Sequence, residues 1–314
     1  MSAGTSRWSL RAPQGDARLV AGFWLGVLGV ACFAITLPAT RLATGTAEHP
    51  QLSPWFVTFG RAALAGLLSA AFLLVARSPW PTAAQWRALS LSMAGNAIGF
   101  PLLLAWALRS VTATHAAVII ALLPLVTAAV AAFALGQRAR PAFWACAVAG
   151  SALVVVFAWL RAGESGGFGF AAADALLAGA VLAAAVGYIY GAKVTPALGA
   201  ERVICWVCLG ALPLTLPVAL WLWPANAGDI RASSWAGFVY VGTVSMWAGF
   251  FAWYRGLDWG GALRVSQTQL LQPFLAMLFA WPLLGERLDA VSVGFALAVV
   301  AIVFASRRVS GMAK

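Results

Sequence analysis

A short stretch of the chain carries an arginine, hydroxyls and amides inside apolar sequence. It reads Arg264-Val-Ser-Gln-Thr-Gln-Leu-Leu-Gln272. In an α-helix, which advances about 100° per residue, Arg264, Thr268 and Gln272 lie on one face. Gln267 flanks that face and Gln269 lies further round. We interpret the polar face as the wall of an aqueous pathway in which these groups bind a solute. The alternative is hydrogen bonding between packed helices, which also uses glutamine and threonine.

His115 is a second candidate for contact with a solute. It could bind a carboxylate or carry a proton, because the imidazole changes charge near neutral pH. It could equally be a hydrogen-bonded residue at a helix start, since it follows Thr112 and Thr114. The sequence leaves both interpretations open.

Asn96 lies between two glycines in another apolar stretch, and Pro101 follows shortly after. A helix interrupted by Gly and Pro that carries an amide is typical of a substrate site in a transporter. The alternative is a close-packed helix crossing in which a neighbouring helix satisfies the Asn96 side chain. We favour the substrate contact.

Arg61 lies about 10 Å into its apolar stretch at 1.5 Å per residue. It could extend its side chain to the outer membrane interface, or it could line a pathway. Pro124 and Pro273 each remove a helix hydrogen bond, and we predict paired kinks or hinges there, although packing alone also produces such kinks.

Three aromatic residues inside apolar stretches are candidates for contact with an aromatic solute, namely Tyr188, Trp247 and Tyr254. Ring stacking or edge contacts would provide the attraction. Most aromatic residues in so apolar a chain serve packing or lie at the membrane interfaces.

The motifs of enzyme chemistry are absent from the sequence. It holds no Walker A motif, no Gly-x-Ser-x-Gly motif and no metal-binding cluster of His and Cys. We therefore expect no cofactor, no metal and no enzyme active site. Asp174 begins an apolar block and Asp258 lies between blocks, so no carboxylate is expected deep in a span. This favours uniport over proton antiport, which often uses a membrane carboxylate.

Composition identifies the elements that must position these residues as membrane-spanning helices. The 314 residues are 62% hydrophobic and 9% charged, whereas soluble domains carry about 25% charged residues. The apolar blocks are about 20 residues long, enough to cross a bilayer as helices. The net charge of +11 indicates contact with anionic lipid, because no cluster of Lys and Arg with exposed aromatics points to nucleic acid.

Ten spans joined by short connections are predicted, which places the chain in the all-α class of integral membrane proteins. They cover residues 20–40, 54–76, 88–108, 112–135, 141–160, 172–193, 201–223, 234–256, 261–284 and 289–306. If the N-terminus is cytoplasmic, fourteen Lys and Arg residues lie on the cytoplasmic side and five on the other. This bias predicts that both termini are cytoplasmic.

An internal repeat divides the ten spans into two halves. Leu123-Pro124 recurs as Gln272-Pro273, and Leu135-Gly136-Gln137-Arg138 recurs as Leu284-Gly285-Glu286-Arg287, at an offset of 149 residues. A half with five spans must have its copy inserted upside down. Two inverted halves around a central site are typical of secondary transporters.

The repeated Pro-x11-Gly-[Glu/Gln]-Arg pattern, together with Phe59-x-Arg61, resembles the drug/metabolite transporter superfamily with EamA-type repeats. The Gly-Glu-Arg turn is close to the family pattern in the second half and becomes Gly-Gln-Arg in the first. Taken as a whole, the chain is most similar to the bacterial YddG-type exporters of aromatic and other amino acids. The resemblance implies a central cavity, with the fifth and tenth helices packed outside it. It also implies a structural role for Arg61, Gly136 and Gly285.

These observations predict both the organisation of the chain and its function. We expect a cytoplasmic segment (1–19), two five-helix repeats (20–160 and 172–306) and a cytoplasmic tail (307–314). We expect an amino-acid exporter of the bacterial inner membrane that works by alternating access. The runner-up is export of drugs or other small metabolites, and a membrane enzyme or scaffold is the alternative of another class. The sequence does not fix the oligomeric state, and a monomer is compatible with it.

Overall fold

The computed structural model describes residues 16–134, 141–164, 172–260 and 265–309. Within these ranges the chain is helical, and its sole β-type pairing is an isolated bridge between Gly45 and Pro50. The predicted site residues Gly136 and Arg264 lie outside the described residues, and so do most of the predicted terminal segments.

The described residues of the first half form eight α-helices and one π-helical segment. They are α1 (Asp16–Ala34), α2 (Thr36–Thr44), α3 (Pro54–Val75), α4 (Ala83–Ser92), η1 (Met93–Gly99), α5 (Phe100–Ala107), α6 (Ala113–Ile120), α7 (Leu123–Ala134) and α8 (Pro141–Glu164).

In the second half, the residues that the structure describes form six α-helices and three non-α segments. They are α9 (Ala172–Leu198), α10 (Ala200–Trp221), η2 (Ala227–Asp229), α11 (Ala232–Tyr240), η3 (Val241–Ala248), α12 (Gly249–Gly260), η4 (Ser266–Leu271), α14 (Gln272–Leu284) and α15 (Ala290–Val309). The η2 and η4 segments are 3₁₀ helices, and η3 is a π-helix.

Seven helical stretches of the described chain are long and apolar enough to cross a membrane. Three shorter apolar helices, Trp144–Phe157, Thr268–Leu284 and Ala290–Ala305, fall within the predicted spans 141–160, 261–284 and 289–306. The predicted class of an all-helical, multi-pass membrane protein is therefore confirmed.

Short polar residues set several helix starts, as the sequence pattern requires. The Ser53 hydroxyl accepts a hydrogen bond from the Phe56 amide at the start of α3 (3.0 Å), and Thr112 does the same for His115 at the start of α6 (3.0 Å). These caps satisfy amide groups that have no partner within their own helix. Gly285 ends α14 with φ 71°, a left-handed conformation that glycine adopts without steric penalty.

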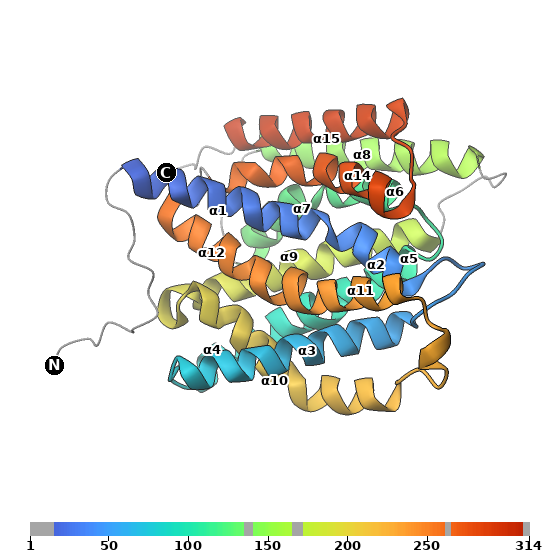
Figure 1. Cartoon of the computed structure of the whole chain (residues 1–314). Coiled ribbons are helices and arrows are strands. Elements are labelled where there is room, and N and C mark those ends of the chain that lie inside the picture. The colour runs from blue at the N-terminus through green and yellow to red at the C-terminus, as the bar shows by residue number, and fades with distance from the viewer. Residues whose placement is uncertain (1–15, 135–140, 165–171, 261–264, 310–314) are drawn as a thin grey trace.

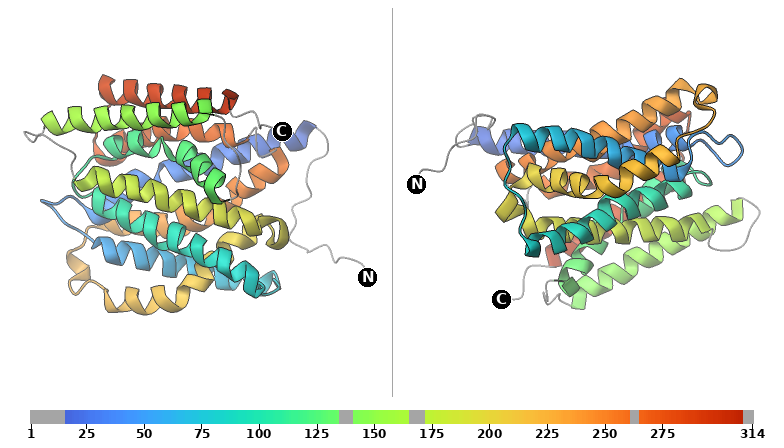
Figure 2. Two further views of the ribbon diagram at one scale, coloured as in Figure 1. Left: turned by 180° about the vertical axis from the view of Figure 1, so that it is seen from behind. Right: turned by 90° about the horizontal axis from the view of Figure 1, so that it is seen from below.

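The helices run roughly alongside one another as a bundle (Figure 1). Helix α3 packs extensively against α10, and α1 packs extensively against α12. Helices α8 and α15 also pack against each other. Figures 1 and 2 show α8 and α15 side by side at one edge of the bundle, the position expected for the two helices outside the centre.

The interruptions of the helices follow the internal repeat. Adding the offset of 149 residues to η1 (Met93–Gly99) gives 242–248, which lies within η3 (Val241–Ala248). The same offset carries the break between α6 and α7 onto the junction between η4 and α14. Since π segments and breaks often occur at functional sites, these four segments direct attention to the space between them.

Candidate functional site

An internal cavity of about 40 Å³ lies between the interrupted helices of both halves. It holds a few waters at most, so a larger solute must enter by movement of the surrounding helices. Its lining comes from α1, α2, α3, η1, α5, α6, α7, α9, α10, η3, α12 and α14, and includes the polar residues Thr36, Arg61, Asn96, Tyr188, Ser245 and Gln272. Below we call it the central cavity.

A chain of hydrogen bonds crosses one wall of the central cavity. The Arg61 guanidinium of α3 donates from Nη2 to Ser245 Oγ of η3 (3.2 Å). Ser245 Oγ and Thr36 Oγ1 of α2 lie 2.7 Å apart. Hydrogen bonds from η3 and α2 therefore fix the position of the Arg61 guanidinium, which belongs to α3.

Arg61 is deeply buried and does not extend to the membrane interface. Only 4% of the residue is exposed, so the alternative in which Arg61 reaches the outer interface is wrong. Its Nε and Nη1 atoms are buried and have no hydrogen-bond partner among the described residues. Arg61 lines the central cavity, in agreement with the alternative in which it faces a pathway.

Asn96 lies where η1 crosses α9 closely, and its side-chain partner is one turn earlier in its own run of helix. It lines the central cavity, and its Nδ2 donates to Ser92 Oγ (3.3 Å). Ser92 in turn donates to the Gly187 carbonyl of α9 (2.9 Å). A Cβ on Gly95 would lie 2.3 Å from the Ala183 carbonyl oxygen, so this glycine is needed for η1 and α9 to approach each other.

The offset of 149 residues relates Asn96 to Ser245. Sequence reasoning did not identify Ser245 as a site residue. Both are polar, both lie in a π segment and both line the central cavity. The repeat itself was the signal that could have identified Ser245.

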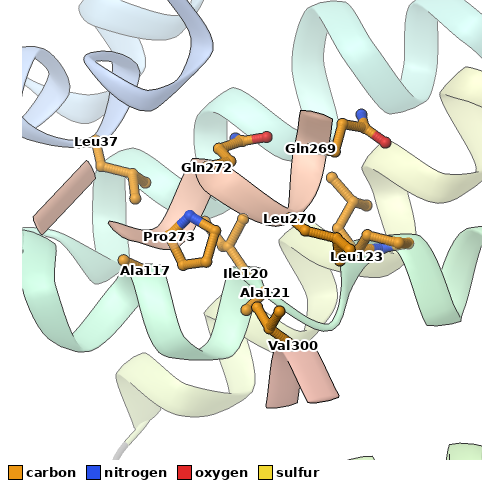
Figure 3. A pocket seen from close by; sticks show the side chains of 11 residues that line it. Leu37, Ala117, Ile120, Ala121, Leu123, Gln269, Leu270, Gln272, Pro273 and Val300 are labelled. Carbon is orange, nitrogen blue, oxygen red and sulfur yellow. The ribbon is translucent and has the colours of Figure 1, made fainter. Parts of the chain in front are cut away.

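A smaller cavity of about 20 Å³ adjoins the central one and shares Leu37, Ile120, Leu123 and Gln272 with it. Gln269 and Gln272 both line it, and Figure 3 shows their amides on one side of the ribbon. The positions related to them by the repeat are Ile120 and Leu123, so the polar groups here come from the second half.

The predicted helical face of Arg264, Thr268 and Gln272 needs correction. Residues 266–271 form a 3₁₀ helix, in which residues three apart share a face. Gln269 therefore joins Gln272, although the prediction had separated them. The Thr268 hydroxyl donates to the Val265 carbonyl (2.7 Å) and is buried away from both cavities. Gln267 lies in η4, and its side chain is outside the described part of the structure.

His115 lies away from the central cavity, in a contact between α6, α8 and α9. Its Nε2 is 2.6 Å from Asp174 Oδ1, and the carboxylate side chain is 2% exposed. The ring packs on Phe157 of α8 with centroids 5.0 Å apart. This environment agrees with the helix-start alternative. Asp174 begins its helix, as the sequence indicated, but sequence reasoning did not identify it as the partner of His115.

Of the three predicted aromatic residues, Tyr188 lines the central cavity, whereas Trp247 and Tyr254 do not. Tyr188 lines the central cavity together with Phe250, and their rings meet edge to face at 6.4 Å. Tyr254 packs behind Phe250 (5.5 Å). Trp247 packs instead against Phe251 (4.7 Å).

The three predicted hinge prolines stand next to interruptions of helices. Pro101 follows η1 at the start of α5, and Pro273 follows η4 at the start of α14. Pro124 is the second residue of α7, directly after the break that follows α6. Proline suits the first turn of a helix, where no amide donor is required.

An ion-pair network joins α2, the start of α6 and the residue after Gly285. Glu286 accepts hydrogen bonds from the Ala113 amide, the Thr114 amide and the Thr114 hydroxyl, each at 2.9 Å. The carboxylate thus binds the N-terminus of α6, which favours negative charge. Arg41 Nε lies 3.4 Å from Glu286 Oε1.

Arg41 extends this network to the loop before α6. It donates to the carbonyls of Leu108 (2.8 Å) and Val111. Leu37, one turn before Arg41 on α2, lines both cavities. Beyond the network is an open depression of about 360 Å³, which Arg41 and Glu286 also line.

The repeated Gly-Glu-Arg turn thus has a physical explanation in the second half. The left-handed Gly285 ends α14 and Glu286 follows as the cap of α6. At the opposite end of the bundle Glu201 of α10 pairs with Arg255 of α12 (2.5 Å). Sequence reasoning missed both ion pairs because their partners are distant along the chain.

The amino-acid sequence of the chain matches a family of known proteins. The model of the EamA-like transporter family matches residues 20–165 and 171–307. "Uncharacterized transporter YdeK" of Bacillus subtilis (strain 168) is 40% identical over 286 residues, which cover 91% of this chain and 96% of that protein. "Aromatic amino acid exporter YddG" of Ancylobacter novellus is 28% identical over 253 residues, which cover 77% of this chain and 82% of the relative.

A solved crystal structure has a similar fold. It aligns with a TM-score of 0.56 and 20% sequence identity, and the alignment covers 94% of this chain and 99% of the other. At this level of identity the likeness concerns the fold alone.

Proposed function

The chain belongs to the EamA-like transporter family, and from this premise we propose that it exports amino acids, aromatic and other neutral ones, across the bacterial inner membrane. In this proposal ten spans form two inverted five-helix repeats, and both termini are cytoplasmic. The Arg41–Glu286 network is then the outer gate and the Glu201–Arg255 pair lies at the cytoplasmic end. The two halves give alternating access to the central cavity.

The observation that carries the proposal is the lining of the central cavity. Its apolar and aromatic part includes Phe33, Phe100 and Phe250, and its polar part includes Arg61, Asn96 and Gln272. Apolar walls with a few convergent polar groups are typical of small-molecule sites. A zwitterion with an apolar side chain matches this combination. The relative named as an aromatic amino acid exporter supports the same substrate class.

Uniport is the mechanism that the cavity favours. None of the described residues that line it is acidic, so no carboxylate there would exchange protons against the substrate. The same feature argues against cationic drugs as the main substrates, because a cation would meet Arg61 without a counter-charge. The paired prolines would absorb the changes of helix direction as one gate closes and the other opens.

Uptake of radiolabelled phenylalanine into liposomes that contain the purified protein tests the proposal. We expect saturable uptake without a pH gradient. Gln272→Ala should reduce this uptake about tenfold, because one amide hydrogen bond to a charged group is worth roughly 1.5 kcal/mol. Thr268→Ala is the matched control, since its hydroxyl bonds within its own helix turn.

Other outcomes would change or reject the proposal. Uptake that requires a pH gradient and is lost in His115→Ala would replace uniport by proton coupling. If a well-folded protein transports no amino acid, the substrate assignment is wrong and export of other metabolites takes its place.

A further inference from the structure

Arg61 carries an uncompensated positive charge at the wall of the central cavity. The residue is 4% exposed, and two of its three side-chain nitrogens have no hydrogen-bond partner among the described residues. Buried donors without partners and buried charges without counter-charges are both costly. An anionic ligand in the cavity would supply the missing acceptors and counter-charge.

The described carboxylates closest to the bundle interior are engaged elsewhere. Glu286 pairs with Arg41, Glu201 with Arg255, and Asp174 with His115. Since none of the described cavity-lining residues is acidic, the protein supplies no anion to Arg61 from this part of the chain.

The geometry around Arg61 prepares its guanidinium for a planar anion. Ser245 holds Nη2, and Thr36 holds Ser245. The Nε and Nη1 donors are left for another acceptor. Nε and Nη1 point to opposite sides of the guanidinium, so the two oxygens of a carboxylate meet one of them together with the second N–H of Nη2.

A substrate ammonium group finds a different environment in the same cavity. The described acceptors there are neutral, such as the side-chain oxygens of Asn96, Gln272 and Thr36. A keto or hydroxyl group finds donors and acceptors among these same amides and hydroxyls. The two ends of a zwitterion are therefore recognised unequally.

We propose that Arg61 is the carboxylate-binding residue of the central cavity, and that the protein recognises monocarboxylates with an aromatic or apolar side chain whether or not they carry an α-amino group. This inference rests on the proposed transport site and narrows its chemistry: the carboxylate is required and the ammonium is dispensable. Aromatic 2-oxo acids, 2-hydroxy acids and arylpropionates join the amino acids as ligands.

A series of phenylalanine analogues tests this inference on the unmodified protein. The probes are L-phenylalanine, 3-phenylpropionate, which lacks the amino group, and phenethylamine and L-phenylalaninamide, which lack the carboxylate. Binding is measured by the ligand-induced shift of the melting temperature in detergent, and competition by inhibition of labelled phenylalanine uptake in proteoliposomes. We expect 3-phenylpropionate to bind within about tenfold of phenylalanine. The two probes without a carboxylate should bind at least about tenfold more weakly than it does, since a hydrogen-bonded charged group contributes about 1.5–3 kcal/mol.

Substitution of Arg61 gives the second part of the test. Arg61→Gln should weaken binding of phenylalanine and 3-phenylpropionate by about 10- to 100-fold, and Arg61→Lys should recover part of the loss. Arg87→Gln is the matched control, because Arg87 is exposed at the surface. If Arg61→Gln does not fold, the analogue series on the unmodified protein still shows whether binding requires the carboxylate.

The results separate this inference from the proposed function. If phenethylamine binds as tightly as 3-phenylpropionate, the inference is overturned, even where phenylalanine is transported. If 3-phenylpropionate binds through Arg61 but no amino acid is transported, the carboxylate site stands and the amino-acid assignment fails. If none of the probes binds to folded protein, both are wrong.

Discussion

Removal of the charge on Glu286 should open the end of the bundle that we propose as the outer gate. The carboxylate accepts three hydrogen bonds at 2.9 Å and pairs with Arg41 at 3.4 Å. In Glu286→Gln one acceptor oxygen becomes a donor that faces a backbone N–H, and the ion pair is lost. The two side chains are only 16% and 11% exposed, so solvent screens the pair incompletely.

The magnitude follows from these contacts. One charge-assisted hydrogen bond contributes roughly 1.5 kcal/mol, and the ion pair together with the helix N-terminus adds about 1 kcal/mol. If these contacts exist only in the closed form, the substitution shifts the ratio of closed to open protein by about 2–3 kcal/mol, or roughly 30- to 150-fold.

Labelling of a cysteine beneath the network measures this shift. Leu37 lines both cavities and is 3% exposed. A Leu37→Cys protein, with the four native cysteines replaced by alanine, is treated with a membrane-impermeant maleimide in right-side-out vesicles. We expect Glu286→Gln to accelerate labelling by about tenfold or more, since the rate follows the open population.

Glu201→Gln is the control, because it breaks an ion pair at the opposite end of the bundle. It should not accelerate labelling from the outer side. Equal labelling rates in the parent and in Glu286→Gln would refute the gate. Equal acceleration by both substitutions would indicate a loosened fold instead.

Two further predictions concern packing and the buried ion pair. Gly95→Ala places a Cβ 2.3 Å from the Ala183 carbonyl oxygen, whereas a Cβ at Gly294 would meet nothing within 4 Å. Gly95→Ala should therefore lower the free energy of unfolding by about 1–3 kcal/mol or more, and Gly294→Ala should raise it by up to about 1 kcal/mol. Thermal melting in detergent measures both changes. Equal melting temperatures for the two variants would contradict the prediction. Asp174→Asn breaks the His115–Asp174 pair and should destabilise the fold by about 1–3 kcal/mol, while transport per folded molecule stays within about twofold. A loss of transport without a loss of stability would assign this pair to the transport cycle.

Much of the helix arrangement could be predicted because it follows from local composition. The predicted span 54–76 matches α3 (Pro54–Val75) within a residue, since an apolar block of this length has few other ways to satisfy its backbone in a bilayer. Breaks in the helices lie beside Pro124 and Pro273, the positions where the sequence predicted paired kinks from the missing amide donor.

The site was less predictable because local helix type and distant partners decide it. The 3₁₀ turn at Ser266–Leu271 changed which glutamines share a face, and no local signal distinguished it from an α-helix. His115 meets Asp174 59 residues away, and Glu286 meets Thr114 172 residues away. Such contacts depend on how the halves pack. Arg61 was identified as unusual from its position in an apolar span, but its burial against Ser245 requires the fold.

Counterflow through the reconstituted protein tests the central claim most directly. Liposomes are loaded with unlabelled phenylalanine, and the entry of external labelled phenylalanine is followed in the absence of any ion gradient. Alternating access between the two halves predicts that internal phenylalanine accelerates the entry of label and produces a transient accumulation above equilibrium. A rate of entry that does not depend on internal phenylalanine would contradict alternating access, and entry equal to that in protein-free liposomes would contradict amino-acid transport.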